Sequence, residues 1–200
     1  MNHTNRQTLI LASSSPRRQE LIQSLGLPYI IRVSDADETV EEKITPAELV
    51  ELLSLRKAST VREMLSDSEK QGIIVGSDTV VAYQGEVLGK PADEEDSFRM
   101  LKALQGTTHE VYSGVACVDA DTGKHVVSHR VTRVTMKPMS DDQIRRYIAT
   151  GEPKDKAGSY GIQGLGATIV ESIEGDYFTV VGLPLSLLSD LLLNFDIQVL

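Results

Sequence analysis

The sequence predicts an α/β fold in which helices cover a mixed β-sheet. Strand-like and helix-like segments alternate in the first half of the chain, and two long strand-like runs joined by a short turn follow later. The seven prolines fall where elements should begin or end, as expected from a residue that interrupts both helices and strands. Early alternation followed by hairpins favours a sheet that contains both parallel and antiparallel pairs.

Local signals give the order of the elements. Helix starts are marked by capping residues, helix ends by glycine, and strands by apolar or β-branched runs. The predicted elements of the first half are a strand at 8–13, a helix from Pro16 that ends just before Gly26 with Ser15 as its cap, a strand at 29–34, a helix from Thr45 to about Leu65, and a strand at 73–83 that turns back at Gln84-Gly85 towards Val87-Leu88. Those of the second half are a helix capped by Asp93 that ends at Gly106, strands at 111–118 and 126–136, a helix capped by Ser140 that ends at Gly151, one strand on each side of a Glu174-Gly175 turn, and a closing helix from Pro184.

Length and charge limit the function classes. A chain of 200 residues fits one domain spanning 1–200 or a domain with two lobes. Its net charge is −9, from 20 basic and 29 acidic residues, whereas a general nucleic-acid binder needs an extended basic face. A small anionic substrate would therefore need a local basic pocket, because the overall field repels it.

Cysteine usage and hydropathy bear on the location of the protein. Cys117 is the only cysteine, so no internal disulfide can form, and its apolar neighbours indicate a buried thiol. The most apolar stretch, 177–195, is interrupted by Gly182, Pro184 and Asp190, and the first residues are polar. We therefore expect no membrane partner, no signal peptide and a cytoplasmic protein.

A first candidate site lies in the turn Ser13-Ser14-Ser15-Pro16-Arg17-Arg18. The N–H groups at a helix start can bind an anion, and the helix dipole favours one there. Arg17 and Arg18 are unfavourable in the first turn of an isolated helix, by about 0.3–1 kcal/mol each, but a bound phosphate would reverse that effect. The alternative is that both arginines are simply solvated. We expect phosphate countercharges that contribute nothing to the fold.

Lys57 and Asp78 are candidates because each is a charged residue in an apolar pattern. On a helical wheel Lys57 falls in the middle of a stripe made by Val50, Leu53, Val61 and Met64. It should either extend to solvent or reach into a polar cleft. Asp78 interrupts the apolar run 73–81, and a carboxylate there is rarely buried unless it is paired, bound to metal or catalytic. Alternatively, the strand ends at Gly76 and Asp78 is a turn residue.

Three further segments give weaker signals. Lys90 follows a hairpin strand, and Glu38 is one acid among many in a loop, although Glu38 and Asp78 could together hold a divalent cation against phosphate oxygens. The stretch from Gly161 to Gly166 has the spacing GxxGxG and follows a polar loop, so the dinucleotide-binding fingerprint fails. Its glycines permit close approach to a ligand, or simply form a tight loop.

Taken in order, six segments resemble the Maf family of nucleotide pyrophosphatases over nearly the whole chain. They are Leu9-Ile10-Leu11-Ala12-Ser13-Ser14-Ser15-Pro16-Arg17-Arg18, Leu55-Arg56-Lys57-Ala58, Gly76-Ser77-Asp78-Thr79, Leu88-Gly89-Lys90-Pro91, Asp155-Lys156-Ala157-Gly158-Ser159-Tyr160-Gly161-Ile162-Gln163-Gly164 and Gly175-Asp176-Tyr177-Phe178-Thr179-Val180-Val181-Gly182-Leu183-Pro184. Relatives often have alanine where this chain has Ser77, a small departure.

The resemblance implies a fold like that of inosine triphosphate pyrophosphatases, with a cleft between two lobes. It implies hydrolysis of a nucleoside triphosphate to the monophosphate and pyrophosphate with a divalent cation, Mg²⁺ or Mn²⁺. The family pattern makes Asp78 the proton acceptor, and the segment around Gln163 is similar to the branch that acts on dTTP and UTP. The remaining matched positions are Arg17, Thr79 and Gln163 for specificity, with Ser13, Arg18, Glu38, Lys57 and Lys90 as further site residues.

One structural consequence and two rival functions follow. If neighbours Asp78 and Thr79 share one cleft, a bulge, bend or strand end is expected at 77–79, since a regular strand sends them to opposite faces. One rival is a non-enzymatic nucleotide-binding regulator of septum formation, which gives Asp78 no chemical task. The other is an RNA-binding module, which the acidic balance, the absence of tryptophan and only nine aromatic residues disfavour. The sequence leaves the assembly state open, a homodimer included.

Overall fold

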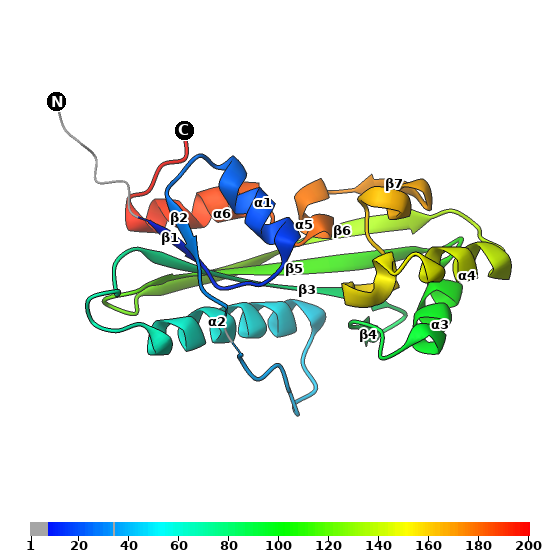
Figure 1. Ribbon diagram of the computed structural model, residues 1–200, viewed down its shortest axis with the longest axis horizontal. Helices are drawn as coiled ribbons and strands as arrows, with labels where there is room; N and C mark the ends of the chain where they lie inside the picture. The colour runs from blue at the N-terminus through cyan, green and yellow to red at the C-terminus, as the bar shows by residue number, and fades with distance from the viewer. Residues whose placement is uncertain (1–7, 34) are drawn as a thin grey trace. The chain divides into compact units, whose positions relative to one another are not determined.

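The computed structural model describes residues 8–33 and 35–200 (Figure 1). Contacts within the chain divide it into two compact units. Unit 1 contains residues 8–78 without Ser34, 113–129 and 182–200, and unit 2 contains residues 79–112 and 130–181.

The strands form one seven-stranded mixed sheet, which confirms the predicted fold class. Its order is β2-β1-β3-β5-β6-β7, with β4 paired to β3. Strand β1 is parallel to both neighbours, whereas β4 on β3 and β7 on β6 are antiparallel. The bounds are β1 Leu9–Leu11, β2 Tyr29–Ile31, β3 Ile73–Tyr83, β4 Glu86–Leu88, β5 Thr108–Asp119, β6 His125–Met136 and β7 Val170–Glu174.

The helices begin largely where the capping signals predict. Thr45 and Ser140 form capping boxes with Glu48 and Gln143, and the Asp93 side chain accepts a hydrogen bond from the backbone of Asp96. The bounds are α1 Pro16–Ser24, α2 Pro46–Met64, α3 Glu94–Leu104, α4 Asp141–Ala149, α5 Tyr177–Val181 and α6 Leu185–Leu192, with 3₁₀ turns η1 Glu152–Asp155, η2 Ala157–Ser159, η3 Gly164–Thr168 and η4 Leu193–Phe195. Within the described residues, none of these helices combines the length and apolar character needed to cross a membrane.

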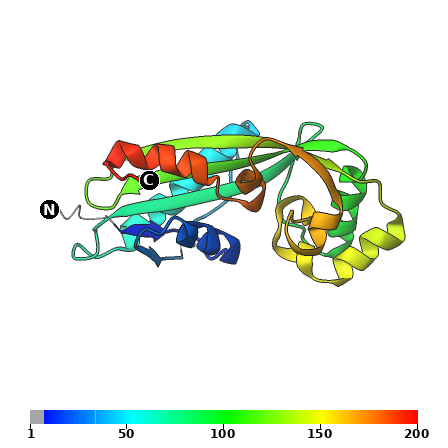
Figure 2. The same ribbon diagram turned by 90° about the horizontal axis from the view of Figure 1, so that it is seen from above.

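Unit 1 has an apolar layer on each face of the sheet. Alternate side chains of β1 point to opposite faces: Leu9 and Leu11 pack with α1 and α6, and Ile10 packs with α2. Figures 1 and 2 show α2 along one face and α1 and α6 along the other. The unit is therefore a helix–sheet–helix sandwich.

Glycines allow α2 to lie directly on the sheet. A Cβ added to Gly76 of β3 would lie 2.1 Å from the carbonyl oxygen of Ser54, and one added to Gly114 of β5 would lie 2.3 Å from that of Val50. No larger residue fits at either contact, so these two glycines fix the distance between α2 and the strands. This contact determines which α2 side chains reach Asp78 in the middle of β3.

Unit 2 has its own core, in which His109 is buried with 3% of its surface exposed. The His109 Nε2 atom lies 2.6 Å from the Tyr160 hydroxyl, and its Nδ1 atom has no hydrogen-bond partner among the described residues. Burial lowers the pKa of His109 from 6.5 to about 4. The imidazole is therefore neutral at physiological pH.

One local prediction is wrong, and another is excluded in part. The run after Gly175 forms helix α5 and not a strand, because the Asp176 carboxylate accepts hydrogen bonds from the Thr179 backbone N–H and hydroxyl, both at 2.9 Å. The strand end that was one form of the break expected at 77–79 is absent, because β3 is one strand from Ile73 to Tyr83. A bulge or bend within β3 stays a prediction. Ser34 of the predicted second strand lies outside the described residues.

The neutral buried His109 predicts a pH dependence of stability. Its folded pKa lies below the unfolded value, so its contribution is complete above pH 6.5 and is lost as the pH falls towards about 4. We expect His109→Gln to remove up to about 1.4 kcal/mol per pH unit from the slope of the unfolding free energy in this range. Denaturant unfolding at several pH values measures it.

The exposed His125 provides the control, since His125→Gln should leave that slope unchanged. Equal slopes in all three proteins, or an NMR titration of His109 near its ordinary pKa, would contradict this account.

Candidate active site

The turn between β1 and α1 places polar groups at the start of a helix. Ser13 is buried, and its hydroxyl accepts a hydrogen bond from the Ser15 backbone N–H at 3.2 Å. Pro16 begins α1 as predicted, although the Ser15 side chain makes no capping bond. The dipole at the start of α1 favours an anion there, and Arg17 and Arg18 lie in its first turn.

Arg18 is a structural residue as well as a cation. Its Nε atom donates to the Gly182 carbonyl at 2.8 Å and its Nη1 atom donates to the Ser77 carbonyl at 2.9 Å. The Ser77 hydroxyl donates to the same Gly182 carbonyl at 2.9 Å. Burial lowers the pKa of Arg18, and the nearby charge of Asp78 opposes that shift. The expectation that both arginines are dispensable for the fold is therefore wrong for Arg18.

Asp78 and Lys57 form a buried ion pair. Asp78 lies on β3 with 7% of its surface exposed, and the Lys57 side chain, from α2, is 13% exposed. The Lys57 Nζ atom lies 2.6 Å from Asp78 Oδ1. Lys57 therefore does not extend to solvent; it reaches a polar group, as the second of its two predicted alternatives requires. Of its predicted stripe, Val50, Leu53 and Val61 are buried, but Met64 is 61% exposed.

Glu38 joins this pair from the loop between β2 and α2. Its Oε1 atom lies 3.0 Å from the same Lys57 Nζ atom, although its side chain is 57% exposed. Arg56, beside Lys57 on α2, holds the loop on both sides of Glu38: its Nη1 atom donates to the carbonyls of Asp37 at 2.5 Å and Thr39 at 2.9 Å. These two bonds fix the backbone on either side of Glu38 and so hold its side chain near Lys57.

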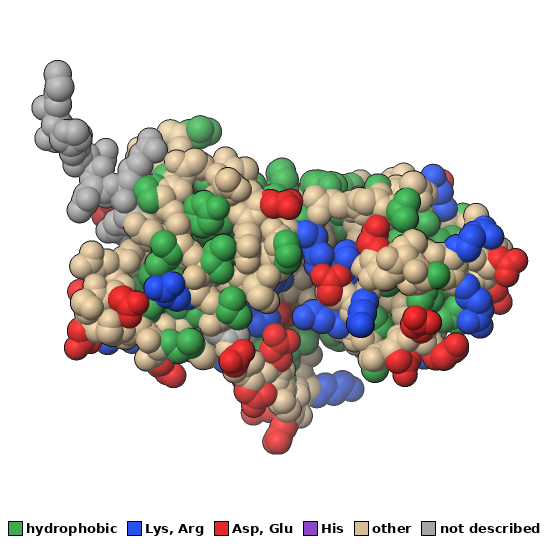
Figure 3. Space-filling model, in the orientation of Figure 1, with side chains coloured by type: hydrophobic (Ala, Val, Ile, Leu, Met, Phe, Trp, Pro, Cys, Tyr) green, Lys and Arg blue, Asp and Glu red, His purple; other side chains and the backbone are tan. Residues whose placement is uncertain are grey.

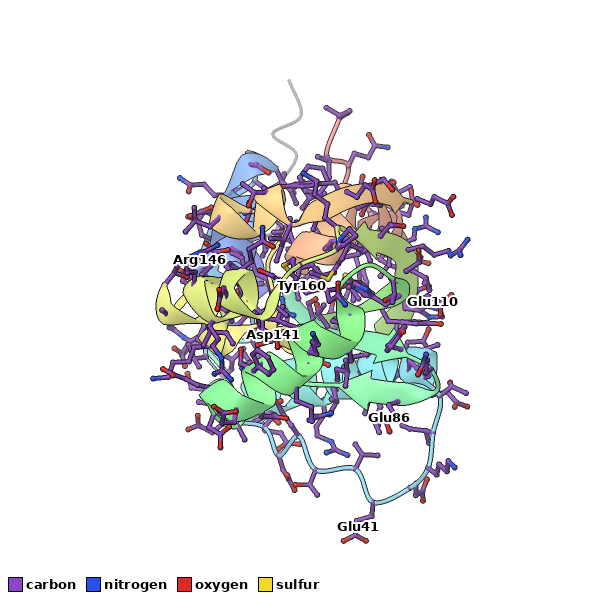
Figure 4. All side chains as sticks on the ribbon, turned by 90° about the vertical axis from the view of Figure 1, so that its right-hand side faces the viewer. Glu41, Glu86, Glu110, Asp141, Arg146 and Tyr160 are labelled. Atoms are coloured by element: carbon purple, nitrogen blue, oxygen red, sulfur yellow. The ribbon has the colours of Figure 1, made fainter. Side chains whose placement is uncertain are left out.

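The loop itself is strongly acidic and exposed. Asp and Glu side chains gather on it at the bottom of Figure 3, and Glu41, labelled in Figure 4, points outward from its tip. Only Glu38 of this loop has an ion pair with Lys57 among the described contacts. The structure therefore selects one acid where the sequence offers several.

The two carboxylates suit a cation that arrives with the substrate. Among the described residues no group of three or more His, Cys, Asp or Glu could hold a metal ion. Glu38 and Asp78 nevertheless share one cation, the Lys57 ammonium. Mg²⁺ is commonly bound by one or two carboxylates together with substrate phosphates, so this donor pair fits such an ion.

The other predicted site residues belong to unit 2. Thr79 follows Asp78 in the unbroken β3, so a shared face for these two side chains is not supported. Lys90 is exposed after β4, and Gly89 before it accepts a hydrogen bond from the Gly158 N–H at 3.0 Å. Gln163 is exposed where η3 begins. The roles of Thr79, Lys90 and Gln163 remain predictions.

Sequence reasoning missed three side chains that fix the backbone near predicted site residues. Arg56 binds the loop around Glu38, and the Ser77 hydroxyl donates to the same carbonyl as Arg18. Glu152 accepts hydrogen bonds from the N–H groups of Leu165 and Gly166, in the segment 161–166. Arg56 and Ser77 lie within the segments that carry the family resemblance, next to Lys57 and Asp78. Glu152 had one local signal, its place between Gly151 and Pro153 just after a predicted helix end. Neither kind of signal indicates which distant backbone groups these side chains bind.

The bonds of Arg18 predict a loss of stability on substitution. Arg18→Met removes the charged donors of two carbonyls from segments 59 and 164 residues away. We expect the free energy of unfolding to fall by about 1.5–3 kcal/mol, the usual range for hydrogen bonds from charged groups. Denaturant titration measures this, with Glu20→Ala on the exposed face of α1 as control. Wild-type stability in Arg18→Met would leave Arg18 with no structural role.

Comparison with known proteins gives the family of the chain. The Maf-like protein family model matches residues 8–195. The chain is 49%, 50% and 51% identical to proteins named dTTP/UTP pyrophosphatase from Desulforamulus reducens, Pelotomaculum thermopropionicum and Moorella thermoacetica. These matches cover 96% of this chain and 98%, 98% and 96% of the relatives. The Staphylococcus aureus Ham1 protein structure matches with a TM-score of 0.45 and 12% identity, covering 82% of this chain and 79% of that one. By the family match and by these identities, the chain belongs to the Maf family.

Proposed function

We propose that this protein hydrolyses nucleoside triphosphates, dTTP and UTP before the others, to the nucleoside monophosphate and pyrophosphate. The observation that carries the proposal is the buried Asp78 carboxylate, held by Lys57 with Glu38 on the same ammonium. Relatives about half identical to this chain bear the name dTTP/UTP pyrophosphatase.

Asp78 is the general base in this proposal. A water attacks the α-phosphorus, its proton passes to the Asp78 carboxylate, the bond between the α-phosphorus and the bridging oxygen breaks, and pyrophosphate leaves with that oxygen. The Asp78 carboxylate is nearly buried, and the Lys57 ammonium at 2.6 Å from its Oδ1 atom holds it in one orientation towards the attacking water. No covalent intermediate with the protein is required.

The cationic side chains hold the phosphates. Lys57 pairs with Asp78 and Glu38 before substrate binds, and the triphosphate gives its ammonium a further, more highly charged partner. The start of α1, with Arg17, is proposed to bind phosphate oxygens, while Arg18 keeps that turn in place through its carbonyl bonds. A Mg²⁺ or Mn²⁺ ion held by Glu38 and Asp78 would supply charge neutralisation at the phosphates.

Asp78→Asn should preserve the fold and remove turnover. The amide keeps the shape and an oxygen that can accept a hydrogen bond from Lys57, but it cannot accept a water proton, so kcat should fall about 10²–10⁴-fold. Pyrophosphate release from UTP is the measurement, and in ¹⁸O-labelled water the label should enter the monophosphate.

Glu51→Gln is the matched control, because Glu51 is a carboxylate of the same helix as Lys57 that pairs instead with His129 at 2.7 Å. Near-normal kcat in a folded Asp78→Asn protein would reject the base assignment. Nucleotide binding without turnover in the wild type would favour a non-enzymatic regulator.

Gln163 is proposed to recognise the base. Its amide carries a donor and an acceptor, which match the imide edge of uracil or thymine, and the exposed side chain has no hydrogen-bond partner among the described residues. A site built to bond one edge leaves polar groups unpaired against another base, which can produce strong discrimination.

Gln163→Ala should therefore reduce the preference for UTP and dTTP over ATP and GTP, chiefly by lowering pyrimidine turnover. The values of kcat/KM for all four triphosphates measure this preference. Leu165→Ala removes an exposed side chain from the same loop and should leave the preference unchanged. A wild-type preference for purines, or unchanged selectivity in Gln163→Ala, would reject the role of Gln163.

A further inference from the structure

The glycine segment from Gly161 to Gly166 is held from below by a single carboxylate. Glu152 Oε2 accepts a hydrogen bond from the Leu165 N–H at 2.9 Å, and Glu152 Oε1 accepts one from the Gly166 N–H at 2.8 Å. Both donors lie in the first turn of η3, whose N–H groups have no partners within the turn itself. Glu152 thus caps η3 from outside the segment.

Tyr147 holds the other end of the segment. Its hydroxyl donates to Glu152 Oε1 at 2.8 Å and accepts a hydrogen bond from the Gly161 N–H at 3.2 Å. Tyr147 lies on α4 with its ring buried in the core of unit 2. Figure 4 shows α4, with Asp141 and Arg146 labelled, and Tyr160 just before the segment. The two ends of the segment are therefore bound to one connected pair of side chains.

The backbone between α4 and the segment is shaped for these bonds. Gly151 has a φ of 75°, which ends α4 and turns the chain into η1, where Glu152 is the first residue. The Lys156 ammonium donates to the Glu152 carbonyl. Despite the cost of desolvation, the bonds from Gly166, Tyr147 and Leu165 lower the pKa of Glu152 below its ordinary value. The carboxylate is accordingly charged at neutral pH.

Two glycines of the segment leave no room for a larger residue. A Cβ on Gly166 would lie 2.0 Å from the Gly161 carbonyl oxygen and 2.7 Å from the Tyr147 hydroxyl. A Cβ on Gly164, whose φ is 62°, would lie 2.7 Å from Glu152 Oε2. Between these anchored ends lies Gln163, exposed and without a hydrogen-bond partner among the described residues.

We propose that Glu152 and Tyr147 are positioning residues that fix the segment so that the Gln163 amide meets the pyrimidine base in one orientation. The inference rests on the proposed role of Gln163 and extends it to two residues that do not touch the base. A fixed amide presents donor and acceptor in a set order, whereas a loose loop lets the amide serve other bases, so the anchors determine selectivity.

The test combines amide exchange with selectivity in Glu152→Gln. A glutamine side chain has only one acceptor oxygen, and its NH₂ group would face a backbone N–H, so at least one anchor is lost. We expect faster hydrogen exchange at Leu165 and Gly166, and a ratio of kcat/KM for UTP over GTP that falls about tenfold, as loss of one hydrogen bond to a charged group implies. Glu174→Gln, an exposed carboxylate of the same unit, should change neither quantity.

A double mutant separates positioning from general support. In a Gln163→Ala background, Glu152→Gln should produce no further loss of selectivity, because the residue acts through Gln163. Tyr147→Phe, which keeps the ring and removes both hydroxyl bonds, should reproduce the effect if Glu152→Gln does not fold. Faster exchange with unchanged selectivity, or losses that simply add in the double mutant, would overturn the inference. Unchanged selectivity in Gln163→Ala alone would instead reject the proposed role of Gln163, while the exchange measurement would still report on the anchors.

Discussion

The ion pair between Lys57 and Asp78 is the interaction on which the candidate site depends. Burying a carboxylate on a strand destabilises the fold unless a cation pairs with it, as Lys57 pairs with Asp78. Removing one partner of such a pair destabilises the protein by far more than the intact pair stabilises it. The pair therefore adds little to the free energy of folding, and its burial indicates a functional site. It holds the Asp78 carboxylate in place and gives the site a cation that can bind phosphate, and the proposed general-base hydrolysis uses both.

The packing of α2 makes that pair possible. Gly76 and Gly114 let α2 approach the backbone of β3 and β5 closely. The Lys57 side chain is therefore near enough to bind Asp78 and does not extend to solvent. The same helix positions Glu38 through the bonds of Arg56 to the loop on either side of it. Arg18 performs a comparable task at the start of α1, where a charged side chain fixes two distant carbonyls. Arg56 and Arg18 thus hold the backbone of the candidate site through hydrogen bonds to its carbonyl groups.

Much of the fold could be predicted because its signals are local. The capping boxes at Thr45 and Ser140, the proline that begins α1 and the Gln84-Gly85 turn each involve residues within a few positions of one another. The prediction failed at α5 for a local reason too: the Asp176 cap outweighed the β-propensity of the aromatic and β-branched residues that follow. At 77–79 the expected strand end is absent, because it was inferred from an assumed shared site and not from turn residues, of which there are none.

The sequence by itself determined the fold class, the helix starts, the family and the charged residues in apolar patterns, since composition, caps and periodicity depend on neighbours along the chain. The tertiary structure decided which of those residues meet. It selected Glu38 from a loop of acids, turned Arg18 towards the backbone, and placed Glu152 beneath a segment 13 residues further on. Such contacts join residues whose separation in sequence carries no information about their distance in space, so only the packing of α2, α1 and α4 could establish them.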